Sequence, residues 1–237
     1  MVLEIHDLKK SFNSPDGTVS QVVDVPRFSL DNGQQMALQG SSGSGKTTFL
    51  NLIAGILRAD SGKVKIAGEE ITAISETGRD RVRASHIGYV FQTFNLLQGY
   101  TALENVALGM MFGPGADYQH AAHLLERVGL KDRMKYKPRQ MSVGQQQRVA
   151  VARALANRPK LVLADEPTGN LDFRNAKDAL ALIRECCREN GAALLLVSHD
   201  RDVLAQFEKV DDLSQINRAA AANDLSARAE IQNGVRA

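Results

Sequence analysis

The sequence predicts an α/β fold with a doubly wound, mainly parallel β-sheet. Two short apolar runs, 161–164 (LVLA) and 193–198 (ALLLVS), are typical of strands that are buried on both faces. They alternate along the chain with segments of helical spacing, and such alternation indicates a parallel sheet. A further strand-like run, 35–39, leads into a glycine-rich loop and then into a helix-like segment, 46–57.

The glycine-rich loop, residues 40–47, reads GSSGSGKT and matches the phosphate-binding pattern G-x-x-x-x-G-K-[ST]. Its backbone N–H groups would surround phosphate oxygens, and glycine allows this close approach. Lys46 would bring positive charge to the terminal phosphates, the Thr47 hydroxyl is the expected Mg²⁺ ligand, and the N-terminus of the following helix points at the anion. The sequence therefore predicts a P-loop NTPase fold whose nucleotide-binding residues are Gly40, Ser41, Ser42, Gly43, Ser44, Gly45, Lys46, Thr47 and Thr48.

A small antiparallel β layer is expected ahead of this loop. Residues 2–8 and 21–28 have the composition of strands, and a Ser-Pro-Asp-Gly turn at 14–17 separates them. Phe12 lies in this region and has two interpretations, an exposed ring that stacks on adenine or an aromatic of the core or a turn. The chemistry of the residue alone does not decide between them.

The hydrophobic period changes after residue 92. Segments 101–110 and 117–128 have helical spacing, and a Gly-Pro-Gly break at 113–115 separates them. Ser142 is placed to cap a third helix that runs to about residue 157. We therefore expect a mainly helical subdomain inserted at about 93–157.

Several residues whose side chains could take part in catalysis follow directly after the predicted strands. In parallel sheets, ligands bind beyond the carboxyl ends of the strands. Asp165 could hold Mg²⁺ through water, Glu166 could orient and deprotonate the attacking water, and His199 could contact the γ-phosphate. Taken alone, a histidine after a strand is more often a hydrogen-bonded loop residue, and an acidic pair is more often structural. One edge of one sheet would then carry Gly40, Gln92, Asp165, Glu166 and His199.

The composition limits the class of protein. The 237 residues carry a net charge of +2, which is too small to argue for binding to nucleic acid. The longest apolar runs, such as 192–197, are far shorter than the roughly 20 residues of a membrane span, and polar residues near the start interrupt any signal-peptide pattern. Cys186 and Cys187 are adjacent on a predicted helix, which favours small helix residues in a reducing compartment over a structural disulfide. We expect a cytoplasmic protein.

Together these residues resemble the ATP-binding subunits of ABC transporters over residues 2 to about 213. The motifs, in the order of the family, are Walker A at 40–47, the glutamine loop at Gln92, a signature-like segment at 142–148 (SVGQQQR), Walker B at 161–165, the catalytic-type Glu166, the D-loop at 171–172 and the switch His199. The resemblance implies one ATP-binding domain at 1–213 and a tail at 214–237 to which we assign no function. Because the chain ends soon after the domain, we expect no large C-terminal regulatory domain.

The resemblance also implies a head-to-tail homodimer that encloses two ATP molecules. Each signature segment would close on the nucleotide held by the other chain's P-loop, so Ser142, Gly144 and Gln145 would act across the dimer, and Asp172 would belong to the D-loop. The remaining implied roles are catalysis for Glu166, His199, Gln92 and Lys46, contact with Mg²⁺ for Thr47, Gln92 and Asp165, and adenine stacking for Phe12.

Segments 91–97 and 166–172 resemble the branch of the family for lipoprotein release, macrolide export and cell division. This likeness implies an ATPase on the inner face of the cell membrane that drives separate integral-membrane permease subunits, moving or extracting an amphiphilic substrate such as a lipoprotein, a lipid or a drug. The alternative is a regulatory ATPase that signals through a membrane partner without transport. A soluble ATPase of DNA repair or translation is disfavoured, because those relatives usually carry long coiled-coil insertions or two ATP-binding halves.

The signature-like segment departs from the family at Val143, where glycine is usual. A β-branched residue adopts a positive φ only with a steric penalty, and it adds bulk near the phosphate. We expect closure of the dimer to survive, with the Val143 side chain pointing away and Ser142 and Gly144 still donating.

Overall fold

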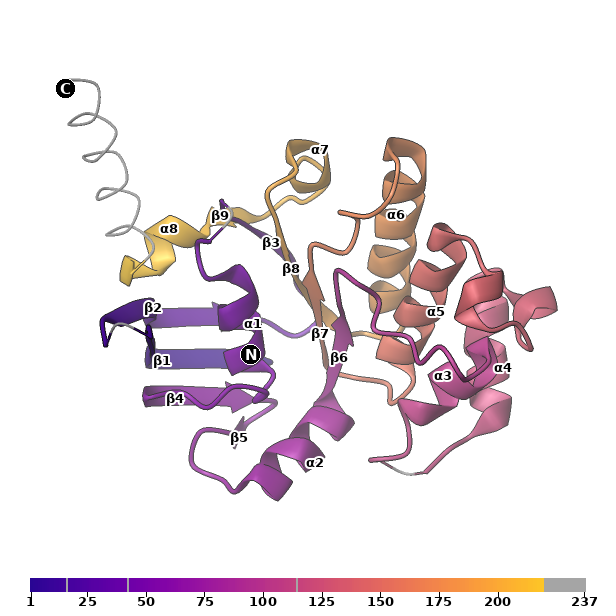
Figure 1. Ribbon diagram of the computed structural model, residues 1–237. Helices are drawn as coiled ribbons and strands as arrows, with labels where there is room; N and C mark the ends of the chain where they lie inside the picture. The colour runs from indigo at the N-terminus through magenta and orange to yellow at the C-terminus, as the bar shows by residue number, and fades with distance from the viewer. Residues whose placement is uncertain (16, 42, 114, 220–237) are drawn as a thin grey trace.

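Two β-sheets organise the chain (Figure 1). The computed structural model describes residues 1–15, 17–41, 43–113 and 115–219. The first sheet is antiparallel with the order β2-β1-β4-β5, and the second has the order β6-β7-β8-β3-β9 with all neighbours parallel. The predicted parallel sheet and the N-terminal antiparallel layer are therefore confirmed. The strands are β1 (Leu3–Asn13), β2 (Val19–Leu30), β3 (Gln35–Gln39), β4 (Ser61–Ile66), β5 (Glu69–Glu70), β6 (Ile87–Val90), β7 (Leu161–Asp165), β8 (Ala193–Ser198) and β9 (Val210–Asp212).

Helices lie in each of the four segments 46–57, 101–110, 117–128 and 142–157 for which the sequence predicts one. Helix α1 is shorter than the predicted 46–57, because the chain turns after Ile53 and passes through Gly55, whose φ of 66° is left-handed. The predicted cap at Ser142 is confirmed, since its side chain accepts a hydrogen bond from the Gln145 N–H. The α-helices are α1 (Lys46–Ile53), α2 (Glu76–His86), α3 (Ala102–Leu108), α4 (Tyr118–Arg127), α5 (Val143–Leu155), α6 (Phe173–Glu189), α7 (Arg201–Leu204) and α8 (Leu213–Ile216).

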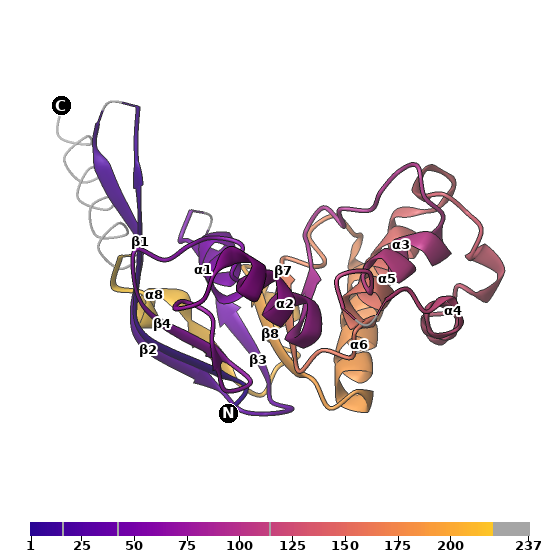
Figure 2. The same ribbon diagram turned by 90° about the horizontal axis from the view of Figure 1, so that it is seen from below.

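The parallel sheet is buried on both faces, and its side chains alternate between two hydrophobic cores. On β7, Leu161 and Leu163 belong to the core that contains α1 and the antiparallel sheet, which we call the α1-side core. Val162 and Ala164 belong to the core that contains α3 to α6, which we call the helical-side core. The alternation follows from the period of two along a strand. Helix α1 consequently lies between the two sheets (Figure 2).

The helical region shares the helical-side core with the sheet. Val106 of α3, Leu125 of α4 and Val151 of α5 are buried in the same cluster as Ala164 of β7 and Leu196 of β8. Figure 1 shows these helices on the side of the parallel sheet opposite the antiparallel sheet. A continuous core therefore ties the helical region to the strands that carry the site.

Strands β1 and β2 form a long hairpin that extends beyond the rest of the antiparallel sheet (Figure 2). The register shifts between Lys10 and Ser11, which leaves Val22 of β2 as the extra residue of a β-bulge. Phe12 is 41% exposed on this hairpin, and the Lys10 ammonium lies 5.5 Å from the centre of its ring.

Among the described residues, none of the helices combines the length and the apolar character that a membrane span needs. Cys186 and Cys187 of α6 are both buried and carry free thiols.

Candidate active site

The carboxyl ends of the parallel strands meet at one edge of the sheet. The Gly40 N–H, just beyond β3, donates to the carbonyl of Ser198 at the end of β8, so the two strand ends are joined directly. A pocket of about 500 Å³ opens at this edge and draws its walls from the P-loop and from the segments after β6, β7 and β8. Its lining residues are Val22, Ser41, Gly43, Gly45, Lys46, Thr47, Thr48, Gln92, Asp165, Glu166 and His199.

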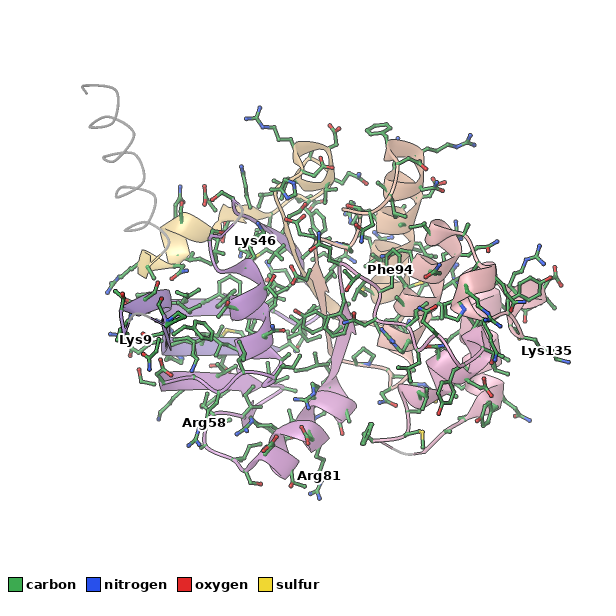
Figure 3. The ribbon with its side chains drawn as sticks, viewed as in Figure 1. Lys9, Lys46, Arg58, Arg81, Phe94 and Lys135 are labelled. Carbon is green, nitrogen blue, oxygen red and sulfur yellow. The ribbon has the colours of Figure 1, made fainter. Side chains whose placement is uncertain are left out.

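Lys46 begins α1, and the P-loop backbone holds its side chain. Gly45 before it has a φ of 87°, and a Cβ there would lie only 2.9 Å from the Val22 carbonyl oxygen, so both conformation and space require glycine. The buried Lys46 ammonium donates to the carbonyls of Gly40 (2.7 Å) and Ser41 (2.8 Å). Figure 3 shows Lys46 at the start of α1. The loop therefore fixes a positive charge inside the pocket.

Asp165 ends β7 on the α1 side of the sheet, because the alternation that points Leu163 into the α1-side core continues to it. The residue is 6% exposed, and its Oδ1 has no hydrogen-bond partner within the described part of the chain. Burial raises the pKa of the carboxyl, whereas a hydrogen bond with the Thr47 side chain and the charge of Lys46 act in the opposite direction. A carboxylate oxygen without a partner beside a threonine hydroxyl offers the hard oxygen ligands that Mg²⁺ prefers.

Glu166 follows β7 and turns back toward the P-loop. Its φ of 42° is uncommon for a residue other than glycine. Its Oε2 accepts from the Ser198 hydroxyl at 2.8 Å, and its Oε1 accepts from the His199 backbone N–H at 3.2 Å and lies 2.7 Å from His199 Nδ1. The Lys46 ammonium lies 3.4 Å from the same Oε1. Groups from the end of β8 and from the P-loop thus hold one buried carboxylate.

Gln92 lies after β6 at the border of the pocket and is exposed. Its carbonyl accepts from the Asn170 side chain at 2.7 Å. A Cβ at Gly169 would lie 3.4 Å from Gln92 Nε2, so the two segments are in close contact. The glutamine loop therefore packs on the turn that leads from Glu166 to α6.

The signature-like segment lies on a different element from the P-loop. The Ser142 hydroxyl accepts from the Gln145 N–H, and Gln145 Oε1 accepts from the Ser142 N–H, which forms a reciprocal cap at the start of α5. Val143 is the first residue of this helix and is 46% exposed, and its φ is not positive, so the steric penalty of a left-handed backbone does not arise. Ser142, Gly144 and Gln145 are not among the described residues that line the pocket around Lys46.

Several other predicted residues also lie outside the pocket lining. Phe12 is exposed on the β1–β2 hairpin. Asp172 caps α6, and hydrogen bonds from Asn175 lower the pKa of its carboxyl. Ser42 and residues 220–237, most of the expected tail, lie outside the described residues.

Gly40 and Ser44 lie in the P-loop but do not line the pocket. A Cβ at Gly40 would lie 2.6 Å from Ser44 Oγ and 3.1 Å from Lys46 Cγ, so a side chain at this position would disturb the Lys46 stem. Glycine at position 40 is therefore explained by packing inside the loop.

Three residues near the site escaped the sequence prediction. Ser198 contacts Glu166, Val22 lines the pocket, and Asn217 contacts both Val22 and Ser44. A signal for Ser198 exists, because it ends an apolar strand directly before a predicted site residue. Val22 and Asn217 carry no such signal, because their importance comes from contacts between distant parts of the sequence.

The fold and the P-loop geometry define a P-loop NTPase. The family described as ABC transporter matches residues 23–169. With this match over more than half of its length, the chain belongs to the ABC transporter family.

Individual relatives agree with this assignment. The chain is 42% identical over 219 residues to the lipoprotein-releasing system ATP-binding protein LolD of Pseudomonas fluorescens, covering 90% of this chain and 95% of that protein. It is 39% identical over 214 residues to the macrolide export ATP-binding/permease protein MacB of Rhodopirellula baltica, covering 88% of this chain but 31% of that protein. Among solved structures, a dimeric post-hydrolysis state of the ATP-binding cassette MJ0796 bound to ADP and Pi matches with a TM-score of 0.81 at 32% identity, covering 89% of this chain and 93% of that one.

Proposed function

We propose that the chain is the ATP-binding and ATP-hydrolysing subunit of an ABC transporter and powers a separate membrane permease. The observation that carries this proposal is the grouping of Lys46, Asp165 and Glu166 around one pocket at the carboxyl edge of the parallel sheet. The likeness to LolD and MacB proteins supports export or membrane extraction of an amphiphilic substrate such as a lipoprotein, a lipid or a drug.

Phosphoryl transfer depends mainly on positioning and on neutralisation of charge. Lys46, held by the carbonyls of the P-loop, would bind the terminal phosphates, while the loop N–H groups and the N-terminus of α1 face the same anion. Glu166 would orient the attacking water and accept its proton, and Ser198 and His199 hold the carboxylate for this task. His199 is also placed at the pocket, where it would contact the γ-phosphate.

Thr47 and Asp165 would hold Mg²⁺, with Gln92 at the border of the same pocket. When bound, the ion neutralises charge on the phosphate oxygens. The buried Asp165 Oδ1, which has no hydrogen-bond partner among the residues that the structure describes, supports this assignment. Mg²⁺ commonly takes one or two carboxylates and completes its shell with phosphates and water. The described residues accordingly offer no group of three or more His, Cys, Asp or Glu that would form a closed cage.

The proposed cycle uses two copies of the chain arranged head to tail. The start of α5 would present the Ser142 hydroxyl and the Gly144 N–H to the nucleotide on the other copy's P-loop, and Gln145 would hold Ser142 through the reciprocal cap. The likeness to the dimeric MJ0796 cassettes supports a dimer of this chain. ATP binding would close the dimer and hydrolysis would reopen it, and the helical region with Gln92 would pass the motion to a permease on the inner face of the cell membrane.

The test is capture of partners from native membranes. A tagged Glu166→Gln chain is loaded with Mg-ATP, captured from detergent-solubilised membranes of the source cells, and analysed by mass spectrometry, with Lys46→Ala as the control that should not retain nucleotide. Recovery of a permease with a large extracytoplasmic domain is the expected result. A cell-wall or division factor in its place would favour a regulatory ATPase that signals without transport, and recovery of the chain alone would contradict the membrane assignment.

A further inference from the structure

Asn217 follows α8 and joins three segments that are far apart in the sequence. Its side chain is completely buried. The Oδ1 atom accepts from the Asp24 N–H at 2.8 Å, and the Nδ2 atom donates to the Val22 carbonyl at 2.9 Å and to the Ser44 carbonyl at 3.5 Å. Because a backbone N–H only donates and a carbonyl only accepts, these partners allow one orientation of the amide.

Two of these contacts lie at the free edge of β2. This strand is at the edge of the antiparallel sheet, and its β-bulge falls at Val22. The Val22 carbonyl and the Asp24 N–H are two residues apart, so they point to the same side of the strand. The Asn217 amide satisfies both of them, as the N–H and C=O of one residue in a neighbouring parallel strand would.

The third contact reaches the P-loop, which β2 approaches closely at this point. Val22 lines the nucleotide pocket, and a Cβ at Gly45 would lie 2.9 Å from the Val22 carbonyl oxygen and 3.6 Å from Asn217 Nδ2. The amide nitrogen therefore spans the gap between the hairpin and the loop.

We infer that Asn217 is a positioning residue for the nucleotide, which holds the β1–β2 hairpin at a fixed distance from the P-loop. The inference rests on the proposed ATP site. If the amide is removed, Lys46 keeps its contacts with the carbonyls of Gly40 and Ser41, so binding of the phosphates is retained. The hairpin, however, is no longer held in line with the loop. This loss should weaken only a ligand that carries a ribose and a base beyond its phosphates and so extends past Val22.

The experiment compares two ligands on the full chain by calorimetry. Mg-ATP carries the base, whereas Mg-tripolyphosphate offers the phosphates alone. Asn217→Ala is expected to bind Mg-ATP about tenfold more weakly and Mg-tripolyphosphate within about twofold of the parent chain, because hydrogen bonds of ordinary strength are lost on one side of the pocket only. Asn217→Ser is neutral, and its shorter side chain cannot reach all three partners, so it should show the same split, and it serves if the alanine variant does not fold.

Asn157 provides the matched control. Its Nδ2 donates to two backbone carbonyls, those of Ala84 and Gly109, and it lies outside the nucleotide pocket. Asn157→Ala should lower Tm and leave the affinities for both ligands unchanged. Equal weakening of both ligands by Asn217→Ala, or no weakening of either, would overturn the inference. A parent chain that binds neither ligand would instead overturn the proposed function.

Discussion

The Ser198 hydroxyl donates a 2.8 Å hydrogen bond to Oε2 of Glu166, and both residues are buried. The same hydroxyl oxygen accepts from the Asp200 N–H at 3.1 Å, which fixes the rotation of the donor. His199 contacts the other carboxylate oxygen of Glu166 through its backbone N–H and its ring. The plane of the Glu166 carboxylate is therefore set from both sides by consecutive residues at the end of β8.

Removal of the Ser198 hydroxyl should misorient the proposed base without removing it. We expect Ser198→Ala to lower kcat about tenfold with KM for ATP within about twofold, because one buried acceptor loses its donor. Ser214→Ala is the control, since it removes a hydroxyl that donates to a carboxylate, Asp212, outside the pocket. Steady-state ATPase assays distinguish the two, and equal kcat values would argue against a positioning role for Ser198.

Glu166→Gln should separate binding from hydrolysis. The amide keeps the size of the side chain and retains an oxygen that can accept from Ser198, but it cannot take a proton from water. We expect kcat to fall by roughly 100-fold or more while the affinity for ATP persists. Unchanged steady-state hydrolysis in this variant would refute the role assigned to Glu166.

Lys46→Ala should lose nucleotide binding itself. The ammonium is the one charge that the P-loop carbonyls hold inside the pocket within the described residues, and charge-assisted bonds to phosphate are among the stronger ones. We expect affinity for Mg-ATP to fall roughly 100-fold or more, measured by calorimetry. Lys63→Ala, which removes an exposed lysine of β4, is the matched control and should bind as the parent chain does. Retained affinity in Lys46→Ala would contradict the P-loop assignment.

Asp165→Asn should stabilise the chain in the absence of nucleotide. Burial raises the pKa of Asp165 in the folded state above its value in the unfolded state. The protonated Asp165 therefore favours the folded state below the unfolded pKa of about 4, and this contribution to the free energy of unfolding is lost as pH rises through the folded pKa. A neutral amide avoids the cost of burying a charged carboxylate whose Oδ1 has no hydrogen-bond partner among the described residues. We expect a higher Tm at neutral pH, by roughly 2–4 °C for each kcal/mol gained, and a difference that shrinks toward pH 4.

The same substitution should abolish the further stabilisation that Mg-ATP gives to the parent chain, since it removes the proposed metal ligand. Thermal scans over pH, with and without Mg-ATP, measure both effects. A Tm at neutral pH below that of the parent chain would show that the hydrogen bond with Thr47 and the charge of Lys46 outweigh the cost of burying the Asp165 carboxylate.

Val143→Gly should change the ATPase rate little. Val143 has helical backbone angles and a partly exposed side chain, so glycine relieves no backbone strain and costs helix stability of only about 1 kcal/mol. We expect kcat within about twofold of the parent chain. Ser142→Ala, in contrast, removes the cap of α5 and the proposed contact across the dimer, and it should lower both Tm and kcat. A rise of tenfold or more in Val143→Gly would show that the valine obstructs closure.

Local signals explain how much of the site was predictable. Asp165 ends β7, and Lys46 begins the helix that follows β3 and the P-loop, so their proximity at the carboxyl edge of the sheet follows from sequence pattern and topology together. The end of α1 was misplaced because helical apolar spacing continues past Gly55, where the backbone turns. Asn217 was missed because its partner Val22 is 195 residues away, and edge pairing through a side-chain amide has no local pattern. The structure shows that the Phe12 side chain is exposed, and its stacking on adenine stays a prediction.

Successive side chains of β7 point alternately into the two cores, and this alternation decides which side of the sheet Asp165 faces. A shift of one residue within 161–165 would exchange the side chains of the α1-side and helical-side cores and would point Asp165 away from the P-loop, although composition and hydrophobicity would be almost unchanged. Insertions and deletions in this strand should therefore be far more damaging than substitutions, while the exposed turn at 31–33 between β2 and β3 should accept changes in length. Natural variation in this strand therefore has to preserve which face of the sheet each residue points to, as well as the identity of the residues.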